Sequence, residues 1–136
     1  MEDDAATRAL IASVLKKEGH EVLEAPDGAT GLALAAQEPP DVVVLDLMMP
    51  SVDGYDVLAA LKRSAATEGV PVLILSAKAQ ISERRRALRS GGDAFLAKPF
   101  APEELGEVIR QLATIDPVAR AEARQGALRE LEAESA

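Results

Sequence analysis

The sequence predicts an α/β fold built on a parallel β-sheet with helices on both faces. Segments with the apolar spacing of helices alternate along the chain with short apolar segments, a pattern typical of repeated strand–helix–strand units. Two of the short segments, 42–47 (VVVLDL) and 70–76 (VPVLILS), are apolar almost throughout. Strands of this composition are typical of a parallel sheet that is buried on both faces.

The helices are predicted from apolar residues three or four positions apart and from start and stop signals. In the first of them, 5–18, Ile11 and Leu15 fall on one face and Gly19 follows as a stop signal. Pro102 stands at the first position of the last helix, where its fixed φ angle is favourable. The predicted helices cover residues 5–18, 29–37, 55–64, 81–90 and 102–115.

The strands are predicted from short apolar runs that end at turn signals. Asp27-Gly28 ends the first run, and Pro39-Pro40 separates the second run from the helix before it. The predicted strands cover residues 21–25, 42–47, 70–76 and 94–97. In open parallel sheets, ligands bind in the crevice outside the carboxyl ends of the strands, so these ends are where functional side chains are expected.

Length and composition indicate one domain without disulfides or membrane spans. The 136 residues are 48% hydrophobic and 2% aromatic, which predicts an aliphatic core, and there is no cysteine for disulfides or thiolate metal sites. No apolar run approaches the roughly 20 residues of a membrane span, and MEDDAATR lacks the features of a signal peptide. The net charge of −8 argues against direct nucleic-acid binding. We therefore expect a soluble cytoplasmic protein.

Polar side chains stand where the predicted strands end. Asp46 and Ser76 close two of the strands, and Lys98 follows a third. Glu2 and Asp3 add two carboxylates near the N-terminus. Because the ends of parallel strands converge on one edge of a sheet, we expect a carboxylate cluster, a hydroxyl and an ammonium group to share one crevice.

This set of groups has the chemistry of a phosphoryl acceptor. Carboxylates that lie close together repel one another, and a hard cation with oxygen ligands, Mg²⁺ or Mn²⁺, relieves the repulsion. A carboxylate such as Asp46 can form a covalent phosphoryl intermediate. The negative charge of the transferred group requires positive charge and hydrogen-bond donors, which Lys98 and Ser76 would supply.

The chain resembles the receiver domains of response regulators, the CheY-like superfamily. The segment DLMMPSVDG at 46–54 resembles the signature around the phosphorylated aspartate, and LSA at 75–77 and KPF at 98–100 follow at matching spacings. The resemblance spans roughly residues 2–115, which would be the receiver domain (1–115), with 116–136 as a helical or disordered tail. It implies a flavodoxin-like, doubly wound parallel sheet with strand order 2-1-3-4-5.

The resemblance also implies roles for single residues. Asp46 would be the phosphoacceptor, and Ser76 and Lys98 would contact the phosphoryl group. Glu2, Asp3, Asp46 and the backbone carbonyl of Met48 would hold the Mg²⁺ or Mn²⁺ ion.

Further implied features concern switching and the lifetime of the phosphoryl group. Phe95 would be the switch aromatic that turns inward when Ser76 moves toward the phosphoryl group. Met48 and Lys78 match positions that tune hydrolysis, and the Lys98–Pro99 peptide bond would be cis.

The implied partners are proteins. A histidine kinase or phosphotransfer protein would donate the phosphoryl group, and the chain would not be a turnover enzyme. The face formed by the family's fourth helix, fifth strand and fifth helix would bind an effector or a second copy. The basic run 84–86 lies on that fourth helix.

One departure from the family pattern concerns the first strand, an apolar segment of about five residues that precedes the acidic pair. Here Met1 alone precedes Glu2. The missing strand is the central one, so strands 21–25 and 42–47 would lack the partner between them. Three explanations are open: a start site upstream of Met1, a strand borrowed from another chain, or a degraded relative with a collapsed sheet.

Two other functions are compatible with the residues. The chain could be a phosphorylation-independent interaction module with a degraded receiver fold. A hydrolase similar to the haloacid dehalogenases would also use a strand-end aspartate with Mg²⁺. That class has a second aspartate two residues after the nucleophile, where this chain has Met48.

Overall fold

A computed structural model describes residues 1–49, 53–78 and 80–134. Residues 50–52 of the segment 46–54, and the last two residues of the tail, lie outside the described residues. The elements, in chain order, are α1 (Ala5–Lys17), α2 (Gly28–Gln37), β1 (Val43–Asp46), α3 (Gly54–Arg63), β2 (Val72–Ser76), α4 (Ile81–Arg89), β3 (Ala94–Ala97), α5 (Pro102–Thr114) and α6 (Pro117–Glu134).

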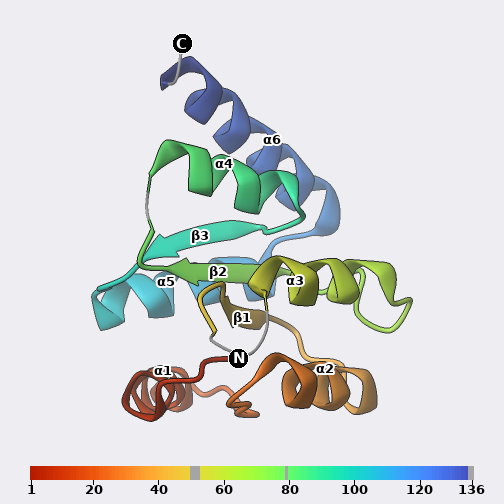
Figure 1. Ribbon diagram of the computed structural model, residues 1–136, viewed down its shortest axis with the longest axis vertical. Helices are drawn as coiled ribbons and strands as arrows, with labels where there is room; N and C mark the ends of the chain where they lie inside the picture. Colours follow the sequence, from red (N-terminus) through yellow and green to blue (C-terminus); the bar gives the residue numbers. More distant parts are fainter. Residues whose placement is uncertain (50–52, 79, 135–136) are drawn as a thin grey trace.

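The sheet consists of three parallel strands in the order β1-β2-β3 (Figure 1). Val43 pairs with Val72 at one end of the β1–β2 ladder, and Ser76 pairs with Ala97 at the end of the β2–β3 ladder. These strands correspond to the third, fourth and fifth strands of the family order, so the predicted α/β class and the parallel sheet are confirmed. The ends of all three strands lie within two residues of those predicted.

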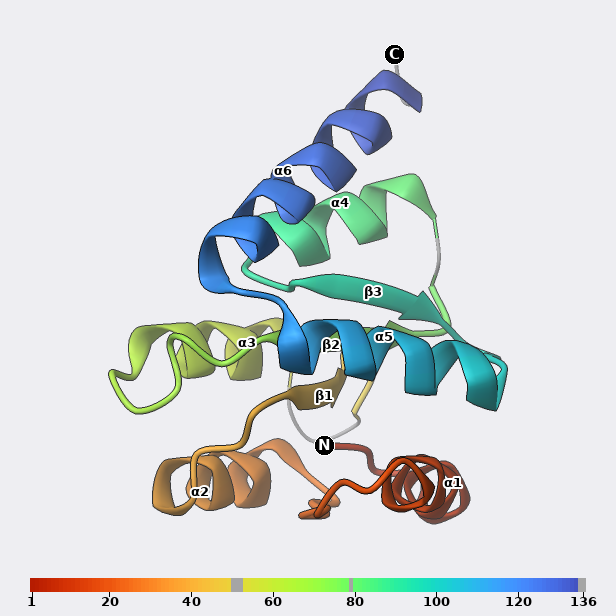
Figure 2. The ribbon, with the colours of Figure 1, turned by 180° about the vertical axis from the view of Figure 1, so that it is seen from behind.

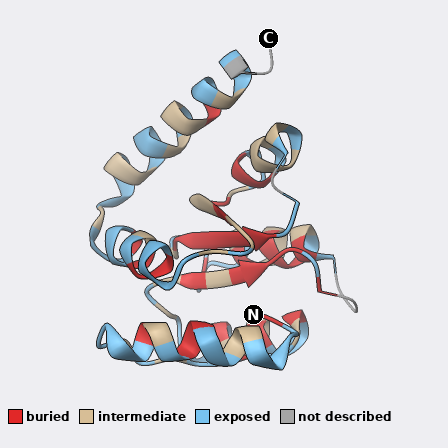
Figure 3. Cartoon of the chain, turned by 90° about the vertical axis from the view of Figure 1, so that its left-hand side faces the viewer, coloured by how far each residue is buried: buried red, intermediate tan, exposed pale blue. Residues whose placement is uncertain are grey.

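Helices cover both faces of the sheet. Alternate residues of a strand point to opposite faces, and in β2 Val72 and Ile74 join the apolar cluster that includes α3, whereas Leu73 and Leu75 join the cluster of α1 and α5. Figure 2 shows α5 lying across the sheet on the face opposite α3. The buried residues concentrate in the strands between these layers (Figure 3).

The predicted strand at 21–25 is wrong, because this segment forms no regular ladder. A strand needs a neighbour for its backbone groups, and of the residues that the structure describes only Met1 and Glu2 bond to backbone between 21–25 and β1. The Met1 amine donates to the Val44 carbonyl (2.7 Å), and the Asp46 N–H donates to the Met1 carbonyl (3.0 Å). On the other side, the Glu2 N–H donates to the Ala25 carbonyl (3.1 Å). Met1 and Glu2 thus continue the sheet by two residues.

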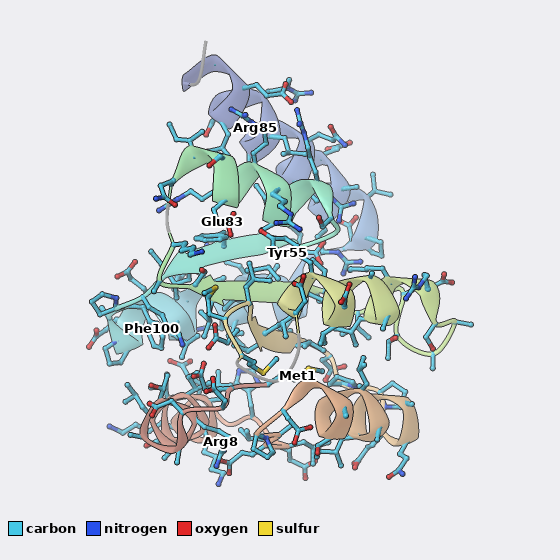
Figure 4. The ribbon with its side chains drawn as sticks, viewed as in Figure 1. Met1, Arg8, Tyr55, Glu83, Arg85 and Phe100 are labelled. Carbon is cyan, nitrogen blue, oxygen red and sulfur yellow. The ribbon has the colours of Figure 1, made fainter. Side chains whose placement is uncertain are left out.

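Beside Met1, the same position continues as a cavity of about 440 Å³. Figure 4 labels Met1, which lies between β1 and the pair α1 and α2. Residues 21–25 and 42–44 line the cavity, together with the apolar residues Ile11, Leu15 and Ile109. The cavity therefore has the place and the lining of a missing central strand.

A close backbone approach fixes the residue at the start of α3. A Cβ atom on Gly54 would lie 2.5 Å from the Leu47 Cα and 2.7 Å from the Leu47 carbonyl oxygen. Both are backbone atoms of the loop that follows Asp46, so the loop itself would have to shift. Glycine at this position therefore keeps α3 against the segment that carries Asp46.

We expect the Gly54→Ala substitution to lower the free energy of unfolding by about 2 kcal/mol, because overpacking against backbone cannot relax through a rotamer change. Urea denaturation measures this loss. The matched control is Gly69→Ala, where an added Cβ meets no atom within 4 Å. Equal stabilities for the two variants would contradict the packing argument.

Candidate functional site

The candidate site lies at the carboxyl edge of the sheet. Asp46 is the last residue of β1 and Ser76 the last of β2, whereas Lys98 directly follows β3. Asp46 is 2% exposed and Ser76 is fully buried. The strand register thus brings the three polar residues predicted from the sequence to neighbouring strand ends, as expected for a parallel sheet.

Lys98 joins two of the predicted carboxylates. Its Nζ lies 2.9 Å from Asp46 Oδ2 and 2.9 Å from Glu2 Oε2. Burial would penalise either carboxylate on its own, and the shared ammonium group compensates both. Although Glu2 stands next to the chain terminus, its backbone bond to Ala25 and this ion pair hold it in place.

The acidic cluster consists of Glu2, Asp3 and Asp46. Each residue contributes one carboxylate oxygen, and these three oxygens all lie within 4.8 Å of one another. Two of the three residues are buried and Asp3 is exposed, so the cluster opens toward solvent on one side. An all-oxygen donor set of this kind suits a hard divalent cation such as Mg²⁺ or Mn²⁺. The residues present therefore fit the ion that the family resemblance implies.

The electrostatics of the cluster show the repulsion that a cation would relieve. Burial raises the pKa of Glu2, and the charge of Asp46 raises it further, whereas the hydrogen bond from Lys98 lowers it. For Lys98, burial alone would lower the pKa, but the hydrogen bonds to Asp46 and Glu2 outweigh it and the net shift is upward. Lys98 thus stays protonated beside the carboxylates.

Backbone groups from the loops orient the remaining atoms of the site. The Met48 N–H donates to Asp46 Oδ1 (2.9 Å), so each oxygen of the Asp46 carboxylate has one donor. Ser76 Oγ accepts a hydrogen bond from the Lys78 N–H (3.0 Å). The Met48 side chain is 49% exposed at the rim. The role of the Met48 backbone carbonyl as a metal ligand stays a prediction. The roles of Met48 and Lys78 in setting how fast the phosphoryl group is hydrolysed stay predictions as well.

The predicted switch residues lie on neighbouring strands. Phe95 of β3 is partly buried against the α3 side of the core, and the Arg84 guanidinium of α4 lies 5.3 Å from the centre of its ring. The Lys98–Pro99 peptide bond is cis, as the resemblance implied. A coupled movement of Ser76 and Phe95 stays a prediction.

Two further residues support the acidic pair. Asp4 caps α1 by accepting a hydrogen bond from the Thr7 N–H (2.9 Å), and the Asp-x-x-Thr spacing before an apolar helix was the available signal. Arg8 Nη1 donates to the Glu2 carbonyl (3.0 Å) from the first turns of α1. No local pattern marks Arg8, because its contact depends on how the chain enters the helix.

Comparison with known proteins identifies the same family throughout. The family model described as the response regulator receiver domain matches residues 1–110. The DNA-binding dual master transcriptional regulator RpaA of Synechocystis is 42% identical over 112 residues, which are 82% of this chain and 46% of RpaA. The chain covers less than half the length of RpaA and of four other curated relatives that it matches.

Solved structures of receiver domains have the same fold. The receiver domain of the Francisella response regulator 1452 is 33% identical with a TM-score of 0.77, over 82% of this chain and 91% of that domain. The receiver domain of the sensor histidine kinase PA1611 from Pseudomonas aeruginosa, solved with a magnesium ion in its active-site cleft, is 26% identical with a TM-score of 0.78, over 85% and 94% of the two chains. No helix among the described residues is long and apolar enough to cross a membrane.

Proposed function

Since the chain belongs to the response regulator receiver domain family, we propose that it is a phosphoacceptor of a two-component signalling system and that Asp46 takes the phosphoryl group. The observation that carries the proposal is the position of Lys98 Nζ, 2.9 Å from both Asp46 and Glu2, beside a cluster of three carboxylates. A signalling role suits the family, whose members include transcriptional regulators.

In the proposed transfer, a carboxylate oxygen of Asp46 forms a bond to the phosphorus atom of a phosphohistidine on a histidine kinase or phosphotransfer protein. The bond between phosphorus and the donor's ring nitrogen breaks, and the donor ring keeps the electron pair and takes up a proton from water. Lys98 stands where it can pair with the negative charge of the phosphoryl oxygens. Ser76 can rotate its hydroxyl to donate a hydrogen bond to the same group.

Glu2, Asp3, Asp46 and the Met48 carbonyl would hold Mg²⁺ or Mn²⁺ in this proposal. When bound, the ion supplies positive charge next to the incoming phosphoryl oxygens. Support comes from the donor set itself and from the magnesium ion in the cleft of the PA1611 receiver domain.

The signal would leave the site through β3 and α4. Movement of Ser76 toward the phosphoryl group would let Phe95 turn inward and change the surface formed by α4, β3 and α5, where an effector or a second copy binds. The contact of Arg84 with the Phe95 ring supports this route, because it joins β3 to α4 directly. A cytoplasmic location stays a prediction from the composition.

The alternative of a phosphorylation-independent interaction module is favoured by one observation, the incomplete sheet with its cavity next to Met1. The receiver function requires Asp46, whereas partner binding by an interaction module would not. The hydrolase alternative loses its basis, because the family model that matches residues 1–110 is that of receiver domains.

We expect incubation with acetyl phosphate and Mg²⁺ to add the mass of one phosphoryl group to the intact chain, and Asp46→Asn to abolish the addition. The matched control is Asp41→Asn, an exposed aspartate just before β1, which should be phosphorylated like the wild type. Chelating the Mg²⁺ should stop the reaction. An unmodified wild-type mass, or a phosphoryl group that survives Asp46→Asn, would refute the proposal.

A further inference from the structure

The C-terminal helix α6 packs across α4 and buries few of its side chains. Figures 1 and 2 show α6 lying over α4 and running on past it to the C-terminus. Among the α6 residues whose side chains are described, only Leu128 is buried, and Val118 is 68% exposed. A helix that buries so little apolar surface depends on its polar contacts for its position.

The strongest of these contacts converge on Asp93, just before β3, whose side chain is 1% exposed. Arg120 Nε lies 3.2 Å and Arg124 Nη1 3.3 Å from Asp93 Oδ1. The other oxygen, Oδ2, accepts hydrogen bonds from the Val72 N–H (2.8 Å) and from Lys62 Nζ (3.3 Å). Oδ2 of Asp93 thus bonds to groups of β2 and α3, and Oδ1 pairs with the two arginines of α6.

A second set of polar contacts joins the far part of α6 to α4. Arg85 Nη2 donates to the Leu131 carbonyl (3.3 Å), and Arg89 forms an ion pair with Glu132. Figure 4 labels Arg85, which lies on the side of α4 nearer α6. At one end of the contact between α4 and α6 the arginines belong to α6, and at the other end they belong to α4. Both partners of the Arg89–Glu132 pair are about half exposed, so this end contributes little to stability.

We propose that α6 is a reversible cover over the arginine-bearing surface of α4, held in place mainly by Asp93. Once undocked, α6 keeps only its own helix propensity and intrahelical contacts, so its amides would lose much of their protection against exchange. Undocking removes from Arg85 and Arg89 the carbonyl and the carboxylate that α6 presents to them. A partner that binds this surface in place of α6 has to supply similar groups, as an acidic helical segment would.

The proposal does not depend on phosphorylation of Asp46. It concerns the opposite edge of the sheet, since Asp93 precedes β3 whereas Lys98 follows it. It adds to the proposed function a contact that an effector or a second copy would have to displace to reach α4.

Hydrogen exchange on the full chain tests the cover. We expect the double variant Arg120→Gln/Arg124→Gln to accelerate exchange of the α6 amides about tenfold while the protected amides of β2 keep their wild-type rates. Arg124→Gln alone, which leaves Arg120 on Asp93, should give a smaller increase. The matched control is Arg129→Gln, an exposed arginine of the same helix, which should exchange like the wild type.

Three results would overturn the proposal. Unchanged α6 exchange in the double variant would mean that Asp93 does not hold the helix. Equal acceleration in β2 and α6 would make α6 a part of the core fold instead of a cover. Wild-type α6 amides that exchange as fast as those of an unstructured peptide would mean that the helix is not docked at all.

Discussion

An N-terminal extension of five apolar residues, placed directly before Met1, is expected to raise the free energy of unfolding by about 3–5 kcal/mol. The extension would occupy the cavity between 21–25 and 42–44 and pair with β1 through the ladder that Met1 already begins. Each buried aliphatic side chain contributes about 2 kcal/mol and each new backbone hydrogen bond about 1 kcal/mol. Ordering the segment costs about 2 kcal/mol per residue.

The extension also replaces the terminal amine of Met1 by an amide. Burial lowers the pKa of that amine to about 6, which shows how poorly its charge is solvated in this position. Thermal unfolding followed by circular dichroism measures the gain, which corresponds to about 10 °C or more in the melting temperature.

The control for this experiment is an extension of the same length made of glycine and serine. It adds chain without side chains that could fill the cavity, so its melting temperature should stay close to that of the original chain. If both extended chains melt at the same temperature, the cavity does not accept a strand.

The substitution Lys98→Met is expected to slow phosphorylation from acetyl phosphate about a hundredfold, because it removes the side-chain cation beside Asp46. It should also lower stability in the absence of divalent cations by about 2 kcal/mol, less than for a fully buried pair because the Lys98 side chain is 22% exposed. Time courses of intact mass measure the first effect, and urea denaturation in a chelator measures the second.

Lys17→Met provides the matched control, since Lys17 is exposed in the last turn of α1 and has no carboxylate partner among the residues that the structure describes. Its phosphorylation rate should equal that of the wild type. A Lys98→Met variant that reacts within a factor of about two of the wild-type rate would show that Lys98 supports only the fold.

The sequence was sufficient to predict the parts of the fold with strong local signals. The two apolar runs around Val44 and Ile74 form buried parallel strands because their side chains fit a sheet covered on both faces. The segment 94–97 forms a strand with the predicted bounds. The same regularity made the rim of the sheet predictable, since parallel strands that end on Asp46 and Ser76 bring these residues together.

The failed prediction at 21–25 has a physical cause outside that segment. Its residues have the composition of a strand, but a strand is stabilised by the neighbour with which it pairs. In the part of the chain that the structure describes, Glu2 alone offers Ala25 a backbone partner. Local composition could not reveal this, because the deficit lies in a segment distant in the sequence.

The contacts of α6 were beyond prediction for a related reason. Arg120 and Arg124 are ordinary residues of a polar helix, and their partner Asp93 stands in a turn before β3. Charged pairs that join residues so far apart have no periodic signature. The sequence could indicate a helical or disordered tail at 116–136, but not the surface that α6 covers.

The most direct test of the central claim is chemical identification of the phosphorylated residue. Borohydride reduces an acyl phosphate on an aspartate to homoserine, which peptide mass spectrometry can locate. After reaction with acetyl phosphate and Mg²⁺, the account predicts homoserine at position 46 and at no other aspartate. Reduction at a different residue, or a phosphorylated chain without any homoserine, would contradict it.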